Sequence, residues 1–405
     1  MKPKCKSFHS RNGALRLLTV LSRDCLENLQ QVLEYITKFS RQASWRTNKT
    51  SDWQITHQDD EKSSTGYCGL KNLGCICYMI SLFQQLFMVP SFREDLLAVD
   101  DPNHENQEPD ENMFYQLQAI FSGLLKSEKQ YVNPKGFCHA FKDWEGQPTN
   151  VMEQMDVEEF LQMFFDRLET AIKGAPQEKT IQAHFGGKLA NEMICQGCPH
   201  QYERPEPFLS LGVPVKNKKS IMEGLNAFIQ GDMLEGDNAY FCAKCDKKVD
   251  TLKRQCIKEL PRYLIVSLKR FEFDFDRMIR VKINDYCEFP MELDMFPYTQ
   301  EGLSRKEKAA KKKREALEKG EEAPDEDEEP LKYDKDYYMF KLKGIVVHTG
   351  TADSGHYYSF IKDTTTQNGE RWYEFNDNIV SDFEASEIAN ECFGGEDSGI
   401  GLINS

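Results

Sequence analysis

The sequence has no long hydrophobic run and too few cysteines for a scaffold built on disulfides. No stretch of about 18 consecutive apolar residues occurs, so no transmembrane helix is expected. Arg16 interrupts the apolar residues 14–21, which disfavours a secretory signal, and the basic N-terminus is only a weak sign of a mitochondrial presequence. Thirteen cysteines in 405 residues, several of them paired closely in sequence, favour catalytic or metal-binding thiols in a reducing compartment. We therefore expect an intracellular protein, cytoplasmic or nuclear.

Basic residues are outnumbered by acidic ones in the body of the chain. The formal net charge is −15, and the first fifty residues hold ten Lys and Arg against three Asp and Glu, so the rest carries −22. An acidic body favours a basic partner over nucleic acid, although solubility accounts for most of these charges. With 40% hydrophobic residues, the chain is long enough for one large catalytic domain with appendages.

The sequence divides into three predicted parts. Apolar residues at helical spacing predict an N-terminal helical segment over 1–39, the polar residues 40–64 indicate a linker, and a catalytic body follows over 65–405. The first part is typical of the end of a helical repeat array, which points to a fragment of a larger protein. Within the body, residues 302–331 pass from a basic into an acidic run, which predicts a solvated helix or a disordered insertion without a core of its own.

One segment of the body has the features of a nucleophile site. Residues 69–86 begin as a Gly/Asn turn and continue as an amphipathic helix that Pro90 ends. Cys77 lies in the first helical turn, where the macrodipole and the free backbone N–H groups favour a thiolate. Cys75 competes for the role, and a buried inert thiol is the alternative for either residue.

Two Cys-x-x-Cys pairs predict a metal site. Each has the spacing of a zinc knuckle, and two knuckles make a closed structural Zn²⁺ site; the predicted ligands are Cys195, Cys198, Cys242 and Cys245. His200 is a possible substitute ligand, but four cysteines already complete a tetrahedral zinc site. The 43 residues between the pairs require intervening strands. Strands are expected over 181–189, 208–215, 250–259 and 262–275.

A predicted C-terminal hairpin supplies a base. If its loop centres near Gln367, paired residue numbers sum to about 734, and His356 then lies opposite residues 376–378. An imidazole with an acceptor on its second ring nitrogen can deprotonate a thiol and protonate a leaving amine. His348 is the rival histidine, but it ends a strand with no acidic residue in register, so we interpret it as structural.

These motifs resemble those of the ubiquitin-specific proteases, which cleave ubiquitin from its conjugates. Residues 69–79 are similar to the family's cysteine box, Gly-Leu-x-Asn-x-Gly-x-x-Cys-Tyr-Met, and residues 154–161 to its second box, Gln-x-Asp-x-x-Glu-Phe-Leu. A strand ending at Arg270 and Phe271, then Gly-His-Tyr with Trp-x-x-Phe-Asn-Asp, complete four boxes in the family order over about residues 66–394. The end of this range also resembles the subfamily of very large members with helical-repeat N-terminal regions.

The resemblance implies an α+β, papain-like cysteine protease fold with a thumb, a palm and zinc-bearing β-rich fingers at about residues 190–260. It implies a thiol hydrolase that cuts isopeptide or peptide bonds after the C-terminal glycine of ubiquitin, with ubiquitin and ubiquitinated proteins as partners. The implied catalytic residues are Cys77 as nucleophile, His356 as base, Asn376 as third member, Asn72 as oxyanion donor and Asp377 as an auxiliary.

The resemblance also implies a site for the Leu-Arg-Leu-Arg-Gly-Gly tail of ubiquitin. Its implied residues are Gln154, Asp156, Glu159, Phe271, Gly355 and Tyr357. The carboxylates of Asp156 and Glu159 would pair with the two arginines, although acids at a helix start are also favoured by the macrodipole alone. Gly355 would give space to the terminal glycines of ubiquitin in a narrow channel, and Tyr357 would form a wall of that channel.

Three departures from the family pattern keep other functions open. Ile76 and Ile80 replace the usual Thr and Asn, and a C-terminal strand of the form Ala-Tyr-x-Leu-x-Tyr is absent. Loss of a palm strand would expose sheet edges, so the chain is a fragment or a neighbouring segment substitutes. The alternatives are a weak or inactive ubiquitin-binding module and a protease for a ubiquitin-like modifier.

Overall fold

The structure is a computed structural model that describes residues 8–23, 25–35, 62–103, 106–319, 330–352, 354–365, 371–395 and 403–404. The chain splits into two units, Met1–Gln58 and Asp59–Ser405, and the split falls within the predicted linker 40–64, of which residues 40–61 lie outside the described residues. The first unit contains α1 (Phe8–Ser22) and a helix over 26–35, with exposed apolar side chains such as Leu21 and Leu26. None of the helices described in either unit is long and apolar enough to cross a membrane.

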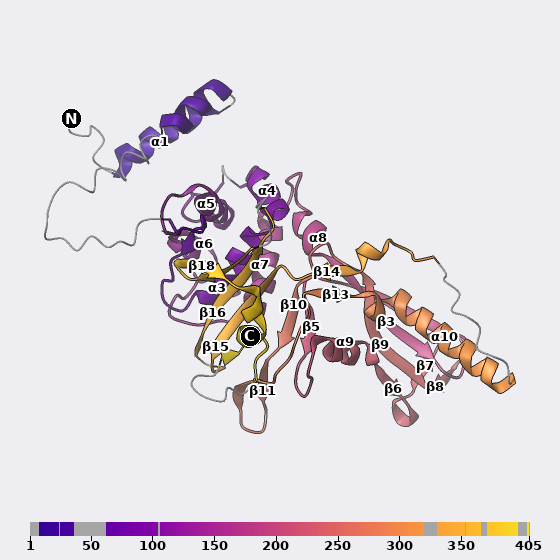
Figure 1. The fold of residues 1–405 in the computed structure, drawn as a ribbon. Helices are drawn as coiled ribbons and strands as arrows, with labels where there is room; N and C mark the ends of the chain where they lie inside the picture. The colour runs from indigo at the N-terminus through magenta and orange to yellow at the C-terminus, as the bar shows by residue number, and fades with distance from the viewer. Residues whose placement is uncertain are drawn as a thin grey trace. The chain divides into compact units, whose positions relative to one another are not determined.

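The second unit begins with a helical thumb. Its helices are α3 (Cys77–Phe87), α4 (Pro90–Ala98), α5 (Met113–Lys126), α6 (Lys135–Ala140), α7 (Val157–Ala171) and α8 (Thr180–Phe185), and the strands β1 (Gly69–Leu70) and β2 (Tyr131–Val132) pair in parallel. Helix α3 packs between α7 and the palm strand β16 (Figure 1). Because it has neighbours on both sides, every residue of α3 except Gln85 is buried, and the predicted amphipathic helix is a central one.

The palm is a five-stranded sheet in the order β18-β17-β16-β15-β19. Its strands are β15 (Gly344–Gly350), β16 (Gly355–Asp363), β17 (Arg371–Asn376), β18 (Ile379–Phe383) and β19 (Ile403–Asn404). Paired residues of β16 and β17 sum to 734, which is the register that the sequence predicted. The two-residue strand β19 pairs with β15 and forms one edge of this sheet.

The fingers are built on a four-stranded antiparallel sheet in the order β4-β3-β9-β6, with a small hairpin beyond it. Their strands are β3 (Gly187–Cys195), β4 (Gln201–Phe208), β6 (Asp232–Leu234), β7 (Tyr240–Cys242), β8 (Lys247–Val249) and β9 (Thr251–Glu259). The remaining elements of this unit are β5 (Leu211–Pro214), α9 (Ile221–Gln230), β10 (Val266–Lys269), β11 (Phe271–Asp274), β12 (Ile279–Lys282), β13 (Glu292–Asp294), α10 (Gln300–Lys319), β14 (Met339–Lys341), α11 (Ile388–Cys392) and the 3₁₀ turns Gly236–Asn238, Phe296–Tyr298, Lys335–Tyr337 and Ala385–Glu387.

Two helices lie in a region where the sequence predicted strands. The predicted strand 181–189 is helical in its first half, because Ile181 and Phe185, four residues apart, are both buried in the thumb core. Helix α9 was missed although Ser220 and Glu223 form a capping signature before it: the Ser220 hydroxyl accepts a hydrogen bond from the Glu223 N–H at 3.3 Å.

Residues 302–319 of the charged insertion 302–331 are helical, and the start of this helix is anchored. Leu303 of α10 is buried in the core beneath the fingers, and Glu307 forms an ion pair with the buried Arg254 of β9, which also pairs with Glu192 of β3 at 2.6 Å. The first turns of helix α10 therefore pack against the fingers sheet (Figure 1) and are not fully solvated. Residues 320–329 lie outside the described residues.

Candidate active site

Cys77 is the first residue of α3, and its side chain is 2% exposed. As the first helical residue it has a backbone N–H with no partner inside the helix. It is hydrogen-bonded to the imidazole of His356, which arrives on β16. Cys75 lies outside the helix, with its backbone N–H bonded to the Val151 carbonyl at 2.6 Å. Of the two competing cysteines, the geometry places Cys77 beside the base.

The imidazole of His356 is held from its other side by Asn376. The distance from His356 Nε2 to Asn376 Oδ1 is 2.8 Å, and the Asn376 amide in turn donates to Glu374 Oε1 at 3.1 Å. Glu374 and Asn376 are two apart on β17, so they share a face of the strand. The order Cys, His, Asn that the sequence predicted is therefore assembled, and Glu374 fixes which way the amide points.

The electrostatics of the pair favour a charged imidazole. The hydrogen bond with Cys77 is the largest influence and raises the pKa of His356 to about 9; the bond to Asn376 and the charge of Asp377 act in the same direction, against burial. An imidazolium at neutral pH holds a proton that it can deliver to a leaving amine.

Asn72 and Asp377 form a second polar pair beside the nucleophile. The Asn72 Nδ2 donates to Asp377 Oδ2 at 3.1 Å, and its Oδ1 accepts from the Gly74 N–H at 3.0 Å and the Ile76 N–H at 3.4 Å. Asp377 has a left-handed backbone with φ of 52°, which turns the chain after β17. Burial raises the pKa of Asp377, and its bond with Asn72 opposes this. The auxiliary Asp377 therefore orients the amide predicted to stabilise the oxyanion.

Gln154 connects the nucleophile with the palm. Its Nε2 lies 3.9 Å from Cys77 Sγ, and its Oε1 accepts from the Gly355 N–H at 3.0 Å. The residue was predicted to lie by the catalytic centre, and this is where the structure places it.

The two predicted tail carboxylates differ in their surroundings. Asp156 is the N-cap of α7 and accepts from the N–H groups of Glu158 at 2.8 Å and Glu159 at 3.2 Å. Burial raises the pKa of Asp156, whereas Arg280 of β12 acts in the opposite direction. Glu159 is exposed. The helix-capping alternative thus applies to Asp156, and Glu159 stays free to meet a cation.

Gly355 stands where no side chain fits. A Cβ built on it would lie 2.3 Å from His348 Nε2 and 2.2 Å from the Thr349 carbonyl oxygen. His348 itself is 5% exposed and lies between the rings of Tyr357 and Phe271, at centroid distances of 4.4 and 5.1 Å. Burial lowers the pKa of His348 to about 3, so this histidine is neutral and packs behind Gly355, in keeping with the structural role interpreted from the sequence.

Comparison with known proteins identifies a family that matches most of this chain. A family profile described as ubiquitin carboxyl-terminal hydrolase matches residues 68–399. The chain belongs to the ubiquitin carboxyl-terminal hydrolase family. Ubiquitin carboxyl-terminal hydrolase 24 of Mus musculus is 37% identical over 396 residues, covering 97% of this chain and 15% of that protein. The 9Y and 34 hydrolases of Homo sapiens are 36% and 35% identical, covering 97% and 98% of this chain but 17% and 11% of theirs.

The predicted resemblance and the papain-like α+β fold are confirmed by this membership. The chain spans roughly a sixth or less of the length of these hydrolases.

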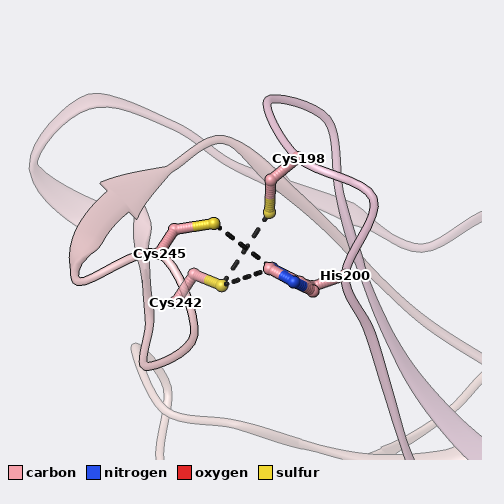
Figure 2. Close-up of side chains that lie close together, drawn as sticks. All are labelled: Cys198, His200, Cys242 and Cys245. Atoms are coloured by element: carbon pink, nitrogen blue, oxygen red, sulfur yellow. Dashed lines mark hydrogen bonds between the residues drawn. The ribbon is translucent and has the colours of Figure 1, made fainter.

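The tip of the hydrolase fingers carries a cluster of metal-ligating side chains. One ligand atom from each of Cys198, His200, Cys242 and Cys245 lies within 4.8 Å of the other three (Figure 2). The Cys198 and Cys242 sulfurs are 3.8 Å apart, and His200 Nδ1 lies 3.5 Å from Cys242 Sγ and 3.2 Å from Cys245 Sγ. Tetrahedral Zn²⁺ with bonds of about 2.3 Å to sulfur sets two thiolates about 3.8 Å apart. The donor set fits structural zinc.

The cluster differs from the predicted ligand set in one member. Cys195 ends β3, where its Sγ accepts from the Thr251 hydroxyl at 3.7 Å, and it packs against the cluster without being one of the four mutually close ligands. His200 takes that place because the chain turns between β3 and β4, so that Cys198 and His200 face the β7–β8 hairpin together. Spacing alone could not choose between them.

Proposed function

We propose that this chain is a thiol hydrolase that cleaves isopeptide or peptide bonds after the C-terminal glycine of ubiquitin. The observation that carries the proposal is the hydrogen-bonded series from Cys77 through His356 to Asn376, with the Asn72 amide beside it. The names of the similar hydrolases support ubiquitin as the substrate.

The residues support a two-step reaction. The Cys77 thiolate attacks the carbonyl carbon of the terminal glycine, and the negative oxygen that forms is met by the Cys77 backbone N–H and the Asn72 amide. The His356 imidazolium gives its proton to the leaving amine as the C–N bond breaks, which leaves a thioester on Cys77. The neutral imidazole then takes a proton from water, whose oxygen attacks the thioester and releases ubiquitin with a free carboxylate and Cys77.

The substrate tail would reach Cys77 beneath Gly355. Gly355 packs directly against His348, which packs against Tyr357, so the backbone at Gly355 would offer the two terminal glycines of ubiquitin a wall without a side chain. We also propose that Glu159, with Asp156 behind it, attracts the arginines of the tail. The free thiols among the described residues fit the reducing, intracellular location that we infer.

The first test is the reaction of the purified, reduced chain with ubiquitin that carries a thiol-reactive group at its C-terminus. We expect one adduct, which peptide mass mapping places on Cys77. Competition with ubiquitin-like modifiers carrying the same group would separate the two substrate classes. Binding of ubiquitin without an adduct would favour the inactive binding module instead.

We further propose that Cys198, His200, Cys242 and Cys245 bind one Zn²⁺, which would stabilise the fingers and take no part in the chemistry. His200→Ala is expected to lose the metal, because it removes one of the four ligands, while Cys195→Ser retains about one zinc per chain. Zinc content by atomic absorption and the thermal midpoint after chelation are the measurements. If Cys195→Ser loses zinc and His200→Ala keeps it, the four-cysteine set predicted from the sequence is the right one.

A further inference from the structure

Lys282 reaches from one hairpin to another beside the active site. It is the last residue of β12, and its ammonium donates to the carbonyl oxygen of His348 at 2.7 Å and to that of Gly350 at 3.4 Å. Both acceptors belong to the end of β15, just before the loop that leads to Gly355 and His356. The side chain therefore ties the β11–β12 hairpin to the strand that precedes the base.

Apart from these two hydrogen bonds, the Lys282 ammonium meets only like charge and a neutral ring among the described residues, namely the Arg270 guanidinium and the His348 imidazole. No carboxylate there pairs with it, the side chain is partly buried, and this burial lowers the pKa of Lys282 to about 8. Removing an ammonium from water without a counter-ion is costly, and two carbonyl oxygens repay only part of that cost. A lysine that serves stability alone is more often exposed or paired.

The opposite end of the same loop is held from the thumb. Gly350 and Gly355 pair across the hairpin, and the Gly355 N–H donates to Gln154 Oε1 at 3.0 Å. Gln154 also contacts Cys77, so the thumb fixes the Gly355 end and Lys282 fixes the Gly350 end. Each end of the loop between β15 and β16 therefore has a hydrogen bond to a side chain from outside the palm sheet.

We propose that Lys282 is a positioning residue for the substrate tail. By donating to the carbonyls of His348 and Gly350, it fixes the distance between the Gly355 backbone, which we expect to line the path of the tail, and Cys77. Lys282 touches neither the reacting atoms nor His356, so it acts through the backbone of β15. The inference rests on the proposed hydrolysis of ubiquitin conjugates and adds a residue that the motifs did not indicate.

The test compares two reactions of the same variant. Lys282→Met keeps the length and apolar stem of the side chain and removes the ammonium. We expect kcat/KM for a fluorogenic ubiquitin C-terminal substrate to fall about 10- to 100-fold, as for other small displacements near a reacting bond. Alkylation of Cys77 by iodoacetamide, which needs no tail channel, should stay within about twofold of the wild type. Lys282→Arg should recover part of the loss, because a guanidinium can also donate to two carbonyls.

Lys216→Met is the matched control. Lys216 ties the same hairpin through Glu272 of β11 at 2.8 Å, but on its outer side and with both side chains largely exposed. This variant should hydrolyse ubiquitin substrate at the wild-type rate.

Two results would overturn the inference. The first is a kcat/KM of Lys282→Met equal to that of the Lys216→Met control. The second is a joint loss of alkylation rate, thermal midpoint and kcat/KM in Lys282→Met, which is the behaviour of a purely structural residue. A wild-type chain that does not turn over the ubiquitin substrate, although Cys77 is alkylated normally, would instead contradict the proposed function, and the inference with it.

Discussion

Replacing Cys77 by alanine is expected to reduce hydrolysis of a ubiquitin substrate by at least about 10⁴-fold, because Cys77 is the thiol that the structure places beside His356. Binding of ubiquitin should persist, since the channel wall and the fingers are unchanged. Turnover by initial rates and binding by calorimetry are the two measurements.

Cys75→Ala is the control for that variant. Cys75 is held by its backbone to Val151 and lies before the helix, so its loss should change the rate by less than about twofold. A Cys77→Ala protein with the wild-type rate, together with an inactive Cys75→Ala protein, would reverse the assignment of the nucleophile.

Asn72→Ala is expected to lower kcat by about 10²- to 10³-fold, the usual effect of removing one oxyanion donor, with little change in KM. The measurement is steady-state kinetics on a fluorogenic ubiquitin substrate. Because the Asn72 amide is oriented by Asp377, Asp377→Ala should also lower kcat.

The double variant decides how Asp377 acts. If its carboxylate works through Asn72, adding Asp377→Ala to Asn72→Ala should cost much less than it costs in the wild type. Additive losses would show that Asp377 acts on the imidazole of His356, whose pKa its charge also raises. Glu374→Gln offers a comparison, since it leaves the Asn72 pair intact and alters only the group that orients Asn376.

Local patterns predicted the parts of the fold that depend on neighbours in sequence. Helix α3, helix α7 and the register of β16 with β17 follow from apolar spacing and from the loop near Gln367, and the structure agrees with them. Helices α8 and α9 were missed because their short apolar runs fit either a strand or a buried helix. At α9 the capping pair of Ser220 and Glu223 was the signal that could have decided the choice.

The sequence could not predict those site residues whose role depends on contacts between distant parts of the chain. Cys77, His356, Asn376 and Asn72 were named from motifs and are brought together by the fold. The contribution of His200 depends on how β3 turns into β4, and that of Lys282 on two hairpins that are more than 60 residues apart in sequence. A lysine that donates to backbone carbonyls leaves no pattern in its sequence neighbourhood.

The burial of α3 on all its sides has a consequence for the energetics of the whole molecule. The helix belongs at once to the packing of the thumb and to that of the palm, where the Ser81 carbonyl accepts from the Ser359 hydroxyl at 3.2 Å and Gln85 donates to the Ile345 carbonyl at 2.9 Å. Because opening either subdomain would break the packing of α3, we expect the two to unfold together as one cooperative unit. The nucleophile thus lies on an element that we expect to be exposed only in global unfolding.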